Sequence, residues 1–270
     1  MKVSVCIPVY NAELFIEQTI KSVLNQTYKD FELIICDNQS TDNTVQIIKK
    51  FNDARINLCI NDENIGMFGN WNLCLKKATG EYIHILCADD YLEPTALEKE
   101  VELLDSNPNM SFVFNASNVI DENNKVMFKR KAFKKSQILD GRKAARKSFR
   151  KKNMFGEPSN VMMRKRASDV IGEFCPEVLY SADWDYWLRM CTIGSVGYIS
   201  EPLTNFRVSK GTGTSELMHQ LDKLKLDDKK LVERVKQNSK ISVTTYDVIS
   251  HVCLIRFRTL LKIVFSAFVN

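Results

Sequence analysis

The sequence lacks the features that mark disulfide-rich, metal-cluster and membrane-spanning proteins. Its eight cysteines include no CxxC pair and follow no regular spacing, which argues against a disulfide framework or metal cluster and favours a reducing compartment. No run of 18 uncharged apolar residues is present, so we predict no transmembrane helix. The first residues lack a long apolar segment before a cleavage site, so we expect a strand there rather than a signal peptide.

Histidine is scarce, and neither internal repeats nor low-complexity linkers occur. His84, His219 and His251 are isolated from one another, so we interpret them as packed or exposed side chains. The chain has 270 residues and 44% hydrophobic residues, enough for a large core. This length suits one large domain, or one domain with a helical extension.

Strands and helices alternate over residues 1–105, which predicts a doubly wound α/β fold with a mostly parallel sheet. Short continuous apolar runs such as 31–36 are typical of strands buried on both faces. We predict a domain at 1–215 and a helical extension at 216–270. The expected strands are 2–9, 31–36, 56–60, 81–87, 111–119 and 196–199; the expected helices are 12–25 (capped by Asn11), 43–51, 70–78, 97–104, 140–151, 182–193 and two after 216, the second at 244–268.

Two of the predicted strands lead into aspartate, the first at Asp37 and the second at Asp89 and Asp90. Ligands of open α/β sheets bind just beyond the carboxyl ends of the strands. Carboxylates there can hold a base or ribose, and a divalent cation that bridges phosphates. Asp also caps helices and opens turns, an alternative that stays open for Asp37. It is weaker for Asp89 and Asp90, because adjacent carboxylates repel each other.

Several short motifs follow one another over residues 1–210. They are Pro8-Val9-Tyr10-Asn11, Ser22-Val23-Leu24-Asn25-Gln26, Asp37 with the turn to Asp42, Asn64 and Gly66 followed by Asn70 and Asn72, Ala88-Asp89-Asp90, and Ala182-Asp183-Trp184-Asp185. In this order they resemble the family 2 glycosyltransferases, here of the bacterial surface-polysaccharide type. These are nucleotide-sugar enzymes with the GT-A fold. The resemblance therefore implies a GT-A fold and a nucleotide-sugar donor, with a UDP-sugar favoured.

The resemblance also implies roles for the motif residues in donor binding. Asp37 would accept a hydrogen bond from the uracil ring N–H, and Asp89 would contact the ribose and the metal side. Asp90 would ligate Mg²⁺ or Mn²⁺, which neutralises charge on the leaving diphosphate. Pro8 and Tyr10 would shape the base pocket, although strand-end packing is an alternative for Tyr10. The other donor-binding residues implied are Asn11, Asn64, Gly66 and Asn70.

Asp183 would be the general base that accepts the proton of the acceptor hydroxyl. An acid in the first turn of a helix is also favoured by the helix dipole, and we prefer that interpretation for Asp185. Trp184 and Trp187 would stack on a sugar, yet their helical spacing favours core packing for at least one of them. Glu157, Arg207 and Ser209, with Trp184, are candidates for the acceptor site or a lid.

The chain departs from the family pattern at two positions. Ala182 stands where relatives carry Glu before the base, so the base would be tuned differently. Ser209 stands where many relatives carry His near the metal, which removes a metal or phosphate contact unless Lys210 or the loop 211–215 substitutes or closes as a lid. The Q-x-x-R-W motif of processive synthases is absent, which favours addition of a single sugar.

Positive charge is concentrated in one segment. The net charge is +5, but residues 129–152 hold twelve Lys/Arg against one acid, Asp140, so the rest of the chain carries 5 − 11 = −6. Such a block is usually a solvated face. It would also attract anionic lipid headgroups or a lipid-pyrophosphate acceptor, by about 1 kcal/mol per basic residue. The cationic apolar helix at 244–268 either lies on a membrane surface or packs on the domain.

These features predict an inverting, metal-dependent, non-processive glycosyltransferase. It would move one sugar from a UDP-sugar to a hydroxyl of a glycan or polyprenyl-linked saccharide, in the cytoplasm or at the inner face of the membrane. Nucleic acid is not an expected partner, because no groove-reading module is present. The alternatives are a non-catalytic nucleotide-binding module and a nucleotidyltransferase. The latter would require a Gly-rich, basic phosphate loop after strand one, which the sequence lacks.

Overall fold

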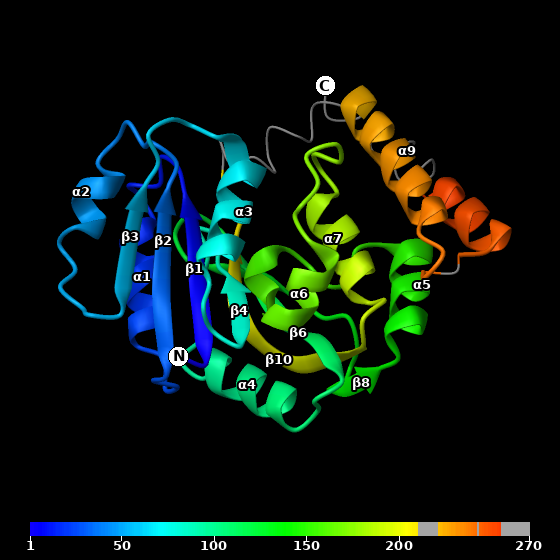
Figure 1. The fold of residues 1–270 in the computed structure, drawn as a ribbon, viewed down its shortest axis with the longest axis horizontal. Coiled ribbons are helices and arrows are strands. Elements are labelled where there is room, and N and C mark those ends of the chain that lie inside the picture. The colour runs from blue at the N-terminus through cyan, green and yellow to red at the C-terminus, as the bar shows by residue number, and fades with distance from the viewer. Residues whose placement is uncertain (210–220, 242, 255–270) are drawn as a thin grey trace.

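The fold is a central β-sheet with helices on both faces (Figure 1). The computed structural model describes residues 1–209, 221–241 and 243–254. The strands are β1 (Val3–Val9), β2 (Phe31–Asp37), β3 (Ile56–Ile60), β4 (Tyr82–Ile85), β5 (Tyr91–Leu92), β6 (Met110–Ile120), β7 (Val126–Arg130), β8 (Gln137–Leu139), β9 (Val161–Arg164) and β10 (Ser195–Arg207). The helices are α1 (Ile16–Leu24), α2 (Thr44–Ile48), α3 (Gly66–Lys77), α4 (Ala96–Asp105), α5 (Gly141–Lys151), η1 (Pro158–Asn160), α6 (Lys165–Ile171), α7 (Ala182–Met190) and α9 (Leu221–Gln237).

The sheet is mixed but mostly parallel, as predicted. Its order is β3-β2-β1-β4-β9-β6-β10-β5, with β7 beside β6 and β8 beside β10. The strands β1, β2, β3, β4, β6 and β10 share one direction, because β9 is antiparallel to both β4 and β6. The carboxyl ends of β1, β2 and β4 therefore meet at the same edge of the sheet, where a ligand site is expected.

Each face of the sheet carries its own hydrophobic core. Alternate residues of β1 contribute to different cores, because neighbouring side chains of a strand point to opposite faces. One core contains residues of α1, α2 and α4, and the other contains residues of α3, α5, α6, α7 and α9. This two-sided burial explains why the first strands read as continuous apolar runs rather than alternating ones.

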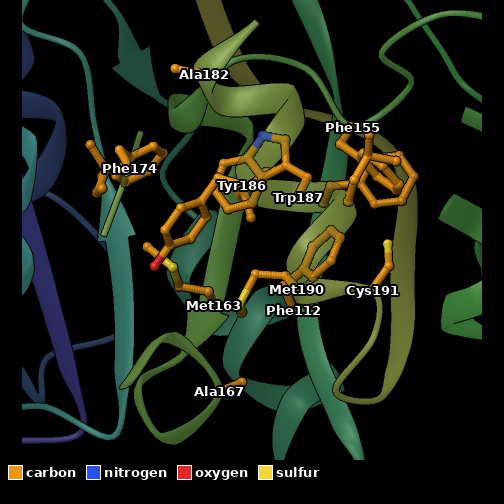
Figure 2. Close-up of a cluster of buried hydrophobic side chains, with 14 of the residues drawn as sticks. Phe112, Phe155, Met163, Ala167, Phe174, Ala182, Tyr186, Trp187, Met190 and Cys191 are labelled. Carbon is orange, nitrogen blue, oxygen red and sulfur yellow. The ribbon is translucent and has the colours of Figure 1, made fainter. Parts of the chain in front are cut away.

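Helix α7 is fixed by an aromatic cluster that Figure 2 shows in close-up. Trp187 is fully buried, with its ring centroid 5.7 Å from that of Phe112, so it is a core residue. The ring of Tyr186 stacks on Phe174 with centroids 3.9 Å apart. Since α7 begins at Ala182, this packing sets the position of its first turn, where Asp183 lies.

Several boundaries differ from the sequence prediction. Helix α1 begins at Ile16 rather than 12, and Asn11 does not cap it, since Asn11 has a φ of +48° and lies before the helix. Helix α3 begins earlier than predicted, and β10 is longer. The strands β5, β7, β8 and β9 and helix α6 were missed; each has seven residues or fewer, too short for a periodic pattern.

The described part of the C-terminal extension packs against α5 and α7. Residues 245–254 are helical, and the rest of the predicted helix at 244–268 lies outside the described residues. The His251 ring stacks on Phe149 of α5, and Asp247 forms ion pairs with Arg146 and Arg150. Every helix of the described ranges is too short or too polar to span a lipid bilayer.

The histidines that the structure describes are packed. His84 is fully buried, with its ring nitrogens 3.1 Å from Glu100 Oε2 and 3.0 Å from the carbonyl oxygen of Ser159. His251 is 2% exposed. His219 lies outside the described residues.

The ion pair between Asp185 and Arg234 joins α9 to α7. Arg234 Nε lies 2.9 Å from Asp185 Oδ1, and the Asp185 side chain is 3% exposed. We expect Arg234→Ala to lower the free energy of unfolding by about 1–3 kcal/mol, because a buried carboxylate loses a charged donor. Urea unfolding followed by circular dichroism measures this change.

Lys229→Ala on the same helix is the matched control. Its ammonium is 4.0 Å from Glu233 and its side chain is 74% exposed, so we expect a change of less than about 0.5 kcal/mol. Equal effects of the two substitutions would contradict a specific role for the Asp185–Arg234 pair.

Candidate active site

A cavity of about 730 Å³ lies beyond the carboxyl ends of β1 and β4. Seven of the predicted site residues line it: Pro8, Tyr10, Asn11, Asn64, Asn70, Asp89 and Ser209. The sequence prediction missed the other lining residues: Val9, Ala12, Leu14, Phe15, Asn38, Met67, Trp71, Cys87 and Ala88. The volume lies within the usual range for small-molecule sites, and the lining combines apolar side chains with a few polar groups.

Asn11 joins the loop after β1 to the loop after β2. Its backbone N–H donates to Ser40 Oγ at 2.9 Å, and its side-chain oxygen accepts from the Thr41 N–H at 2.8 Å. The positive φ of Asn11 allows both contacts, and Asn tolerates this conformation better than most residues. These hydrogen bonds fix the two loops to each other, and the loops contribute Asn11 and Asn38 to the cavity lining.

Asp37, also predicted to bind the donor, does not itself line the cavity; it is fully buried at the end of β2, opposite Val9 in the sheet register. Its Oδ2 accepts a hydrogen bond from the Ser40 N–H at 3.0 Å. Its Oδ1 is also buried and has no hydrogen-bond partner among the described residues. An unsatisfied carboxylate oxygen is costly in a protein interior, so this atom calls for a donor from a ligand.

Asparagine side chains connect the loop after β2 to helix α3. The Asn38 amide donates to Asn64 Oδ1 at 2.8 Å, and the Asn61 amide donates to Asn38 Oδ1 and to Asn70 Oδ1. The Asn70 amide donates to the Cys36 carbonyl at 2.7 Å. Gly66 does not line the cavity; it opens α3 with a φ of +76°. The network fixes this part of the lining. Asn38 belongs to the turn motif after Asp37, whereas Asn61 belongs to no motif that we recognised.

Asp89 and Asp90 have different surroundings despite being adjacent. Asp89 lines the cavity, and burial raises the pKa of its carboxyl. Asp90 is fully buried behind it, where its Oδ2 accepts from Ser159 Oγ at 2.5 Å and its Oδ1 accepts from the Arg207 N–H at 2.8 Å. Burial and the charge of Asp89 raise the pKa of Asp90 well above its usual range. Asp89 is thus the carboxylate that faces a ligand.

The described residues fit one mode of metal binding. Among them, no group of three His, Cys, Asp or Glu side chains converges as a protein-only metal site requires. A Mg²⁺ or Mn²⁺ ion that bridges phosphates needs only one or two protein carboxylates, the other ligands being phosphate oxygens and water. Asp89 meets this requirement. Asp90 is fully buried and does not line the cavity, so its role as a metal ligand stays a prediction.

Arg207 holds the Asp89–Asp90 turn in place. Its side chain is 2% exposed, and its Nε donates to the Asp89 carbonyl at 2.8 Å. Its other nitrogens donate to Gln18, Asn124 and the carbonyl of Asp121. Arg207 was predicted to act in the acceptor site or a lid, but this burial and bonding give it a structural position instead. Ser209, two residues on, does line the cavity.

Asp183 lies in the first turn of α7, and its carboxyl has a strongly perturbed pKa. Burial, with the charge of Glu157, raises the pKa of Asp183 to about 7. The Asn153 amide donates to its Oδ2 at 3.0 Å, and the Trp184 N–H donates to its Oδ1 at 2.7 Å. A carboxyl with a pKa near 7 is suited to accept a proton at neutral pH.

Glu157 and Arg130 link Asp183 to the Asp89–Asp90 turn. The guanidinium of Arg130 forms a two-pronged ion pair with the Glu157 carboxylate, one contact being 2.8 Å. The charge of Glu157 raises the pKa of both Asp90 and Asp183, and both aspartates in turn raise the pKa of Arg130. These mutual effects indicate that acids from three separate segments of the chain lie within electrostatic range of Arg130.

The loop that carries Glu157 is fixed by close packing. Gly156 has a φ of +87°, and a Cβ added there would lie 2.8 Å from Asn160 Nδ2. Its carbonyl accepts from Trp187 Nε1 at 3.1 Å. Trp184 Nε1 donates to Ser148 Oγ at 2.9 Å, so this half-buried residue also supports α5.

The pKa of Asp183 predicts a pH-dependent stability. Between about pH 4 and pH 7 the folded state retains a proton on Asp183 that the unfolded state has lost. Stability is therefore lost as pH rises through this window. We expect Asp183→Asn to raise the melting temperature relative to wild type above pH 7, with the difference shrinking towards pH 4. Thermal denaturation at both ends of the window measures this, with the exposed Asp169→Asn as charge-matched control. A difference independent of pH would contradict the assignment.

The sequence matches the family described as "Glycosyl transferase family 2" over residues 4–172. An uncharacterized glycosyltransferase of Methanocaldococcus jannaschii is 31% identical over 214 residues, covering 76% of this chain and 70% of the relative. An Escherichia coli protein named UDP-Glc:alpha-D-GlcNAc-diphosphoundecaprenol beta-1,3-glucosyltransferase is 40% identical over 121 residues. That match covers 45% of this chain and 47% of the Escherichia coli protein.

Solved structures share the fold at low sequence identity. S. aureus TarS 1–349, in complex with UDP-GlcNAc, has a TM-score of 0.69 and 18% identity, covering 94% of this chain and 79% of that chain. A mannosyltransferase from Pyrobaculum calidifontis, in complex with GDP-Man and Mn²⁺, has a TM-score of 0.60 and 19% identity, covering 94% and 73%. The family match includes more than half of the sequence, and the named relatives are glycosyltransferases, which disfavours both alternatives considered above. The chain belongs to glycosyltransferase family 2 and is a glycosyltransferase with the GT-A fold.

Proposed function

We propose that this enzyme transfers a single sugar, with inversion, from a UDP-sugar to a hydroxyl of a lipid-linked saccharide or glycan. The observation that carries the proposal is the buried Oδ1 of Asp37, which has no hydrogen-bond partner among the described residues and whose neighbour in the sequence, Asn38, lines the 730 Å³ cavity. Uracil presents one ring N–H that can donate to such a carboxylate. Pro8 and Tyr10 at the end of β1 flank the position of the base, and Tyr10 is 49% exposed, which leaves its ring available for stacking.

The diphosphate of the donor would lie near Asp89. Asp89 would hold a Mg²⁺ or Mn²⁺ ion, and the bound ion would stabilise negative charge on the departing nucleoside diphosphate. The raised pKa of Asp89 fits this role, because a buried carboxylate gains most from a cationic partner. The mannosyltransferase of similar fold that was solved with GDP-Man and Mn²⁺ supports the choice of ion.

Asp183 would act as the general base in a single displacement. Its carboxylate takes the proton of the acceptor hydroxyl as the hydroxyl oxygen bonds to the anomeric carbon. The bond from that carbon to the phosphate oxygen breaks at the same time, and its electron pair leaves with the diphosphate. Burial, with the charge of Glu157, keeps the pKa of Asp183 high enough for proton uptake, and Asn153 orients the carboxylate.

The acceptor proposal draws on relatives. The Escherichia coli protein is named for transfer of glucose from UDP-Glc to a GlcNAc-diphosphoundecaprenol. We therefore propose a polyprenyl-diphosphate saccharide as acceptor, reached at the inner face of the cytoplasmic membrane through an anionic lipid surface. The absent Q-x-x-R-W motif favours one transfer per binding event over polymerisation.

Asp183→Asn tests the base. The substitution keeps the size and most hydrogen bonds of the side chain but removes proton acceptance, so we expect transfer to fall at least about 100-fold. Binding of UDP, measured by isothermal titration calorimetry, should stay near wild type. Asp169→Asn on the exposed face of α6 should transfer at the wild-type rate. Wild-type transfer by Asp183→Asn would overturn the assignment.

Asp37→Asn tests recognition of the base. Uracil has a proton on ring nitrogen N3 and cytosine has none, so the wild type should bind UDP more tightly than CDP. We expect Asp37→Asn to weaken UDP binding by about tenfold or more and to reduce this preference, since a charged hydrogen bond is lost. Competition binding with both nucleotides gives the ratio. Equal affinity of the wild-type enzyme for UDP and CDP would refute the proposed contact.

A further inference from the structure

Strand β7 exposes three consecutive large apolar side chains. Val126 is 45% exposed, Met127 48% and Phe128 57%. Neighbouring side chains of a strand point to opposite faces, so neither face of β7 is covered. Strand β7 pairs only with β6 among the described strands. An apolar strand exposed on both faces is unusual for a surface that contacts water alone.

Lysines flank these apolar residues. Lys125, Lys129 and Lys131 are exposed, and within the described ranges none of them forms an ion pair. No acidic residue occurs from 123 to 139. We refer to Lys125, Val126, Met127, Phe128, Lys129 and Lys131 together as the β7 surface.

The arginines of the same basic segment behave differently from these lysines. Arg130 pairs with Glu157, while Arg146 and Arg150 pair with Asp247. Three arginines of the basic segment are thus engaged in ion pairs, whereas Lys125, Lys129 and Lys131 form none within the described ranges. A surface of flexible lysines around an apolar centre suits a fluid anionic surface, because the side chains can adjust to the headgroups.

Both ends of the β7 surface are tied to the active site. Before the strand, the Asn124 side chain accepts a hydrogen bond from Arg207, which holds the Asp89 carbonyl. At its other end, Arg130 pairs with Glu157, whose charge acts on Asp183. A partner seated on β7 would therefore lie next to the base and the cavity.

We propose that the β7 surface docks the enzyme on an anionic lipid bilayer, with the lysines on lipid phosphates and Phe128 in the interface. The inference rests on the proposed lipid-linked acceptor, which the bilayer would present beside Asp183. A second copy of the chain is a poorer occupant, because edge-to-edge pairing of two β7 strands would bring their lysines together.

The experiment measures binding of the full chain to vesicles of phosphatidylcholine, with and without phosphatidylglycerol. We expect binding only with phosphatidylglycerol, and weaker binding at high salt. Replacing Lys125, Lys129 and Lys131 by Gln should weaken it at least tenfold, since each charge contributes about fivefold. Phe128→Ser should weaken it at least threefold, because one apolar side chain no longer enters the interface.

The controls make the same chemical changes elsewhere. Lys29, Lys49 and Lys50, exposed at the α2 side of the sheet, are replaced by Gln, and Val170 on α6, 68% exposed, by Ser. Both controls should bind vesicles nearly as the wild type does. Equal losses in β7 and control variants would overturn the proposal, as would a wild type that ignores phosphatidylglycerol. A solution dimer that Phe128→Ser dissociates would instead assign β7 to a second copy.

Hydrolysis of the UDP-sugar without lipid separates this proposal from the proposed function. The β7 variants should hydrolyse donor like the wild type, because none of the replaced residues lines the cavity. If the β7 variants hydrolyse the donor and bind vesicles as the wild type does, only the proposed docking surface is rejected. If the β7 substitutions weaken vesicle binding but the wild type does not hydrolyse the UDP-sugar, only the proposed chemistry is rejected.

Discussion

The buried carboxylate of Asp90 organises the turn through which Asp89 reaches the cavity. It accepts hydrogen bonds from Ser159, which precedes β9, and from the backbone of Arg207 at the end of β10. Arg207 in turn binds the carbonyl of Asp89, so strands from both halves of the sheet fix one short turn. Hydrogen bonds to a charged group are strong in a low-dielectric interior, and leaving such a group unpaired is costly. The turn is therefore held rigidly while Asp89 faces the cavity.

The same low dielectric raises the proton affinity of Asp183, the residue proposed as the base. Asp183, Glu157 and Asp90 all act electrostatically on the guanidinium of Arg130, and burial, together with the charge of Glu157, raises the pKa of Asp183 to about 7. This pKa shift lowers stability at neutral pH, as expected where a site is arranged for chemistry rather than for folding. The aromatic cluster beneath α7 supplies compensating burial and keeps the first turn of that helix fixed.

The charged residues discussed above fall into two groups, arginines in ion pairs within the fold and exposed lysines around β7. Arginines of α5 and α9 hold the C-terminal helices against the domain through Asp247 and Asp185. The lysines around β7 have no such partners among the described residues and surround exposed apolar side chains next to the acid cluster. Arginine suits fixed, two-pronged contacts with carboxylates, whereas lysine suits a variable anionic surface. The placement of the two residue types thus follows their geometry.

Local sequence patterns determined the parallel strands, the helices with a clear apolar face, and the strand ends that carry Asp37 and Asp89. These features depend on residues close together in the sequence, through side-chain periodicity and through the residue preferences of helix caps and turns. Tertiary structure decided what local pattern does not encode: that Asp90 faces inward while Asp89 faces the cavity, that Arg207 is a buried support, and that Asn38 lines the cavity. It also brought Asp90 and Asp183 within electrostatic range of Glu157 and Arg130. Such pKa shifts and hydrogen-bond partners depend on distances between segments far apart in the chain, and only the packed fold sets those distances.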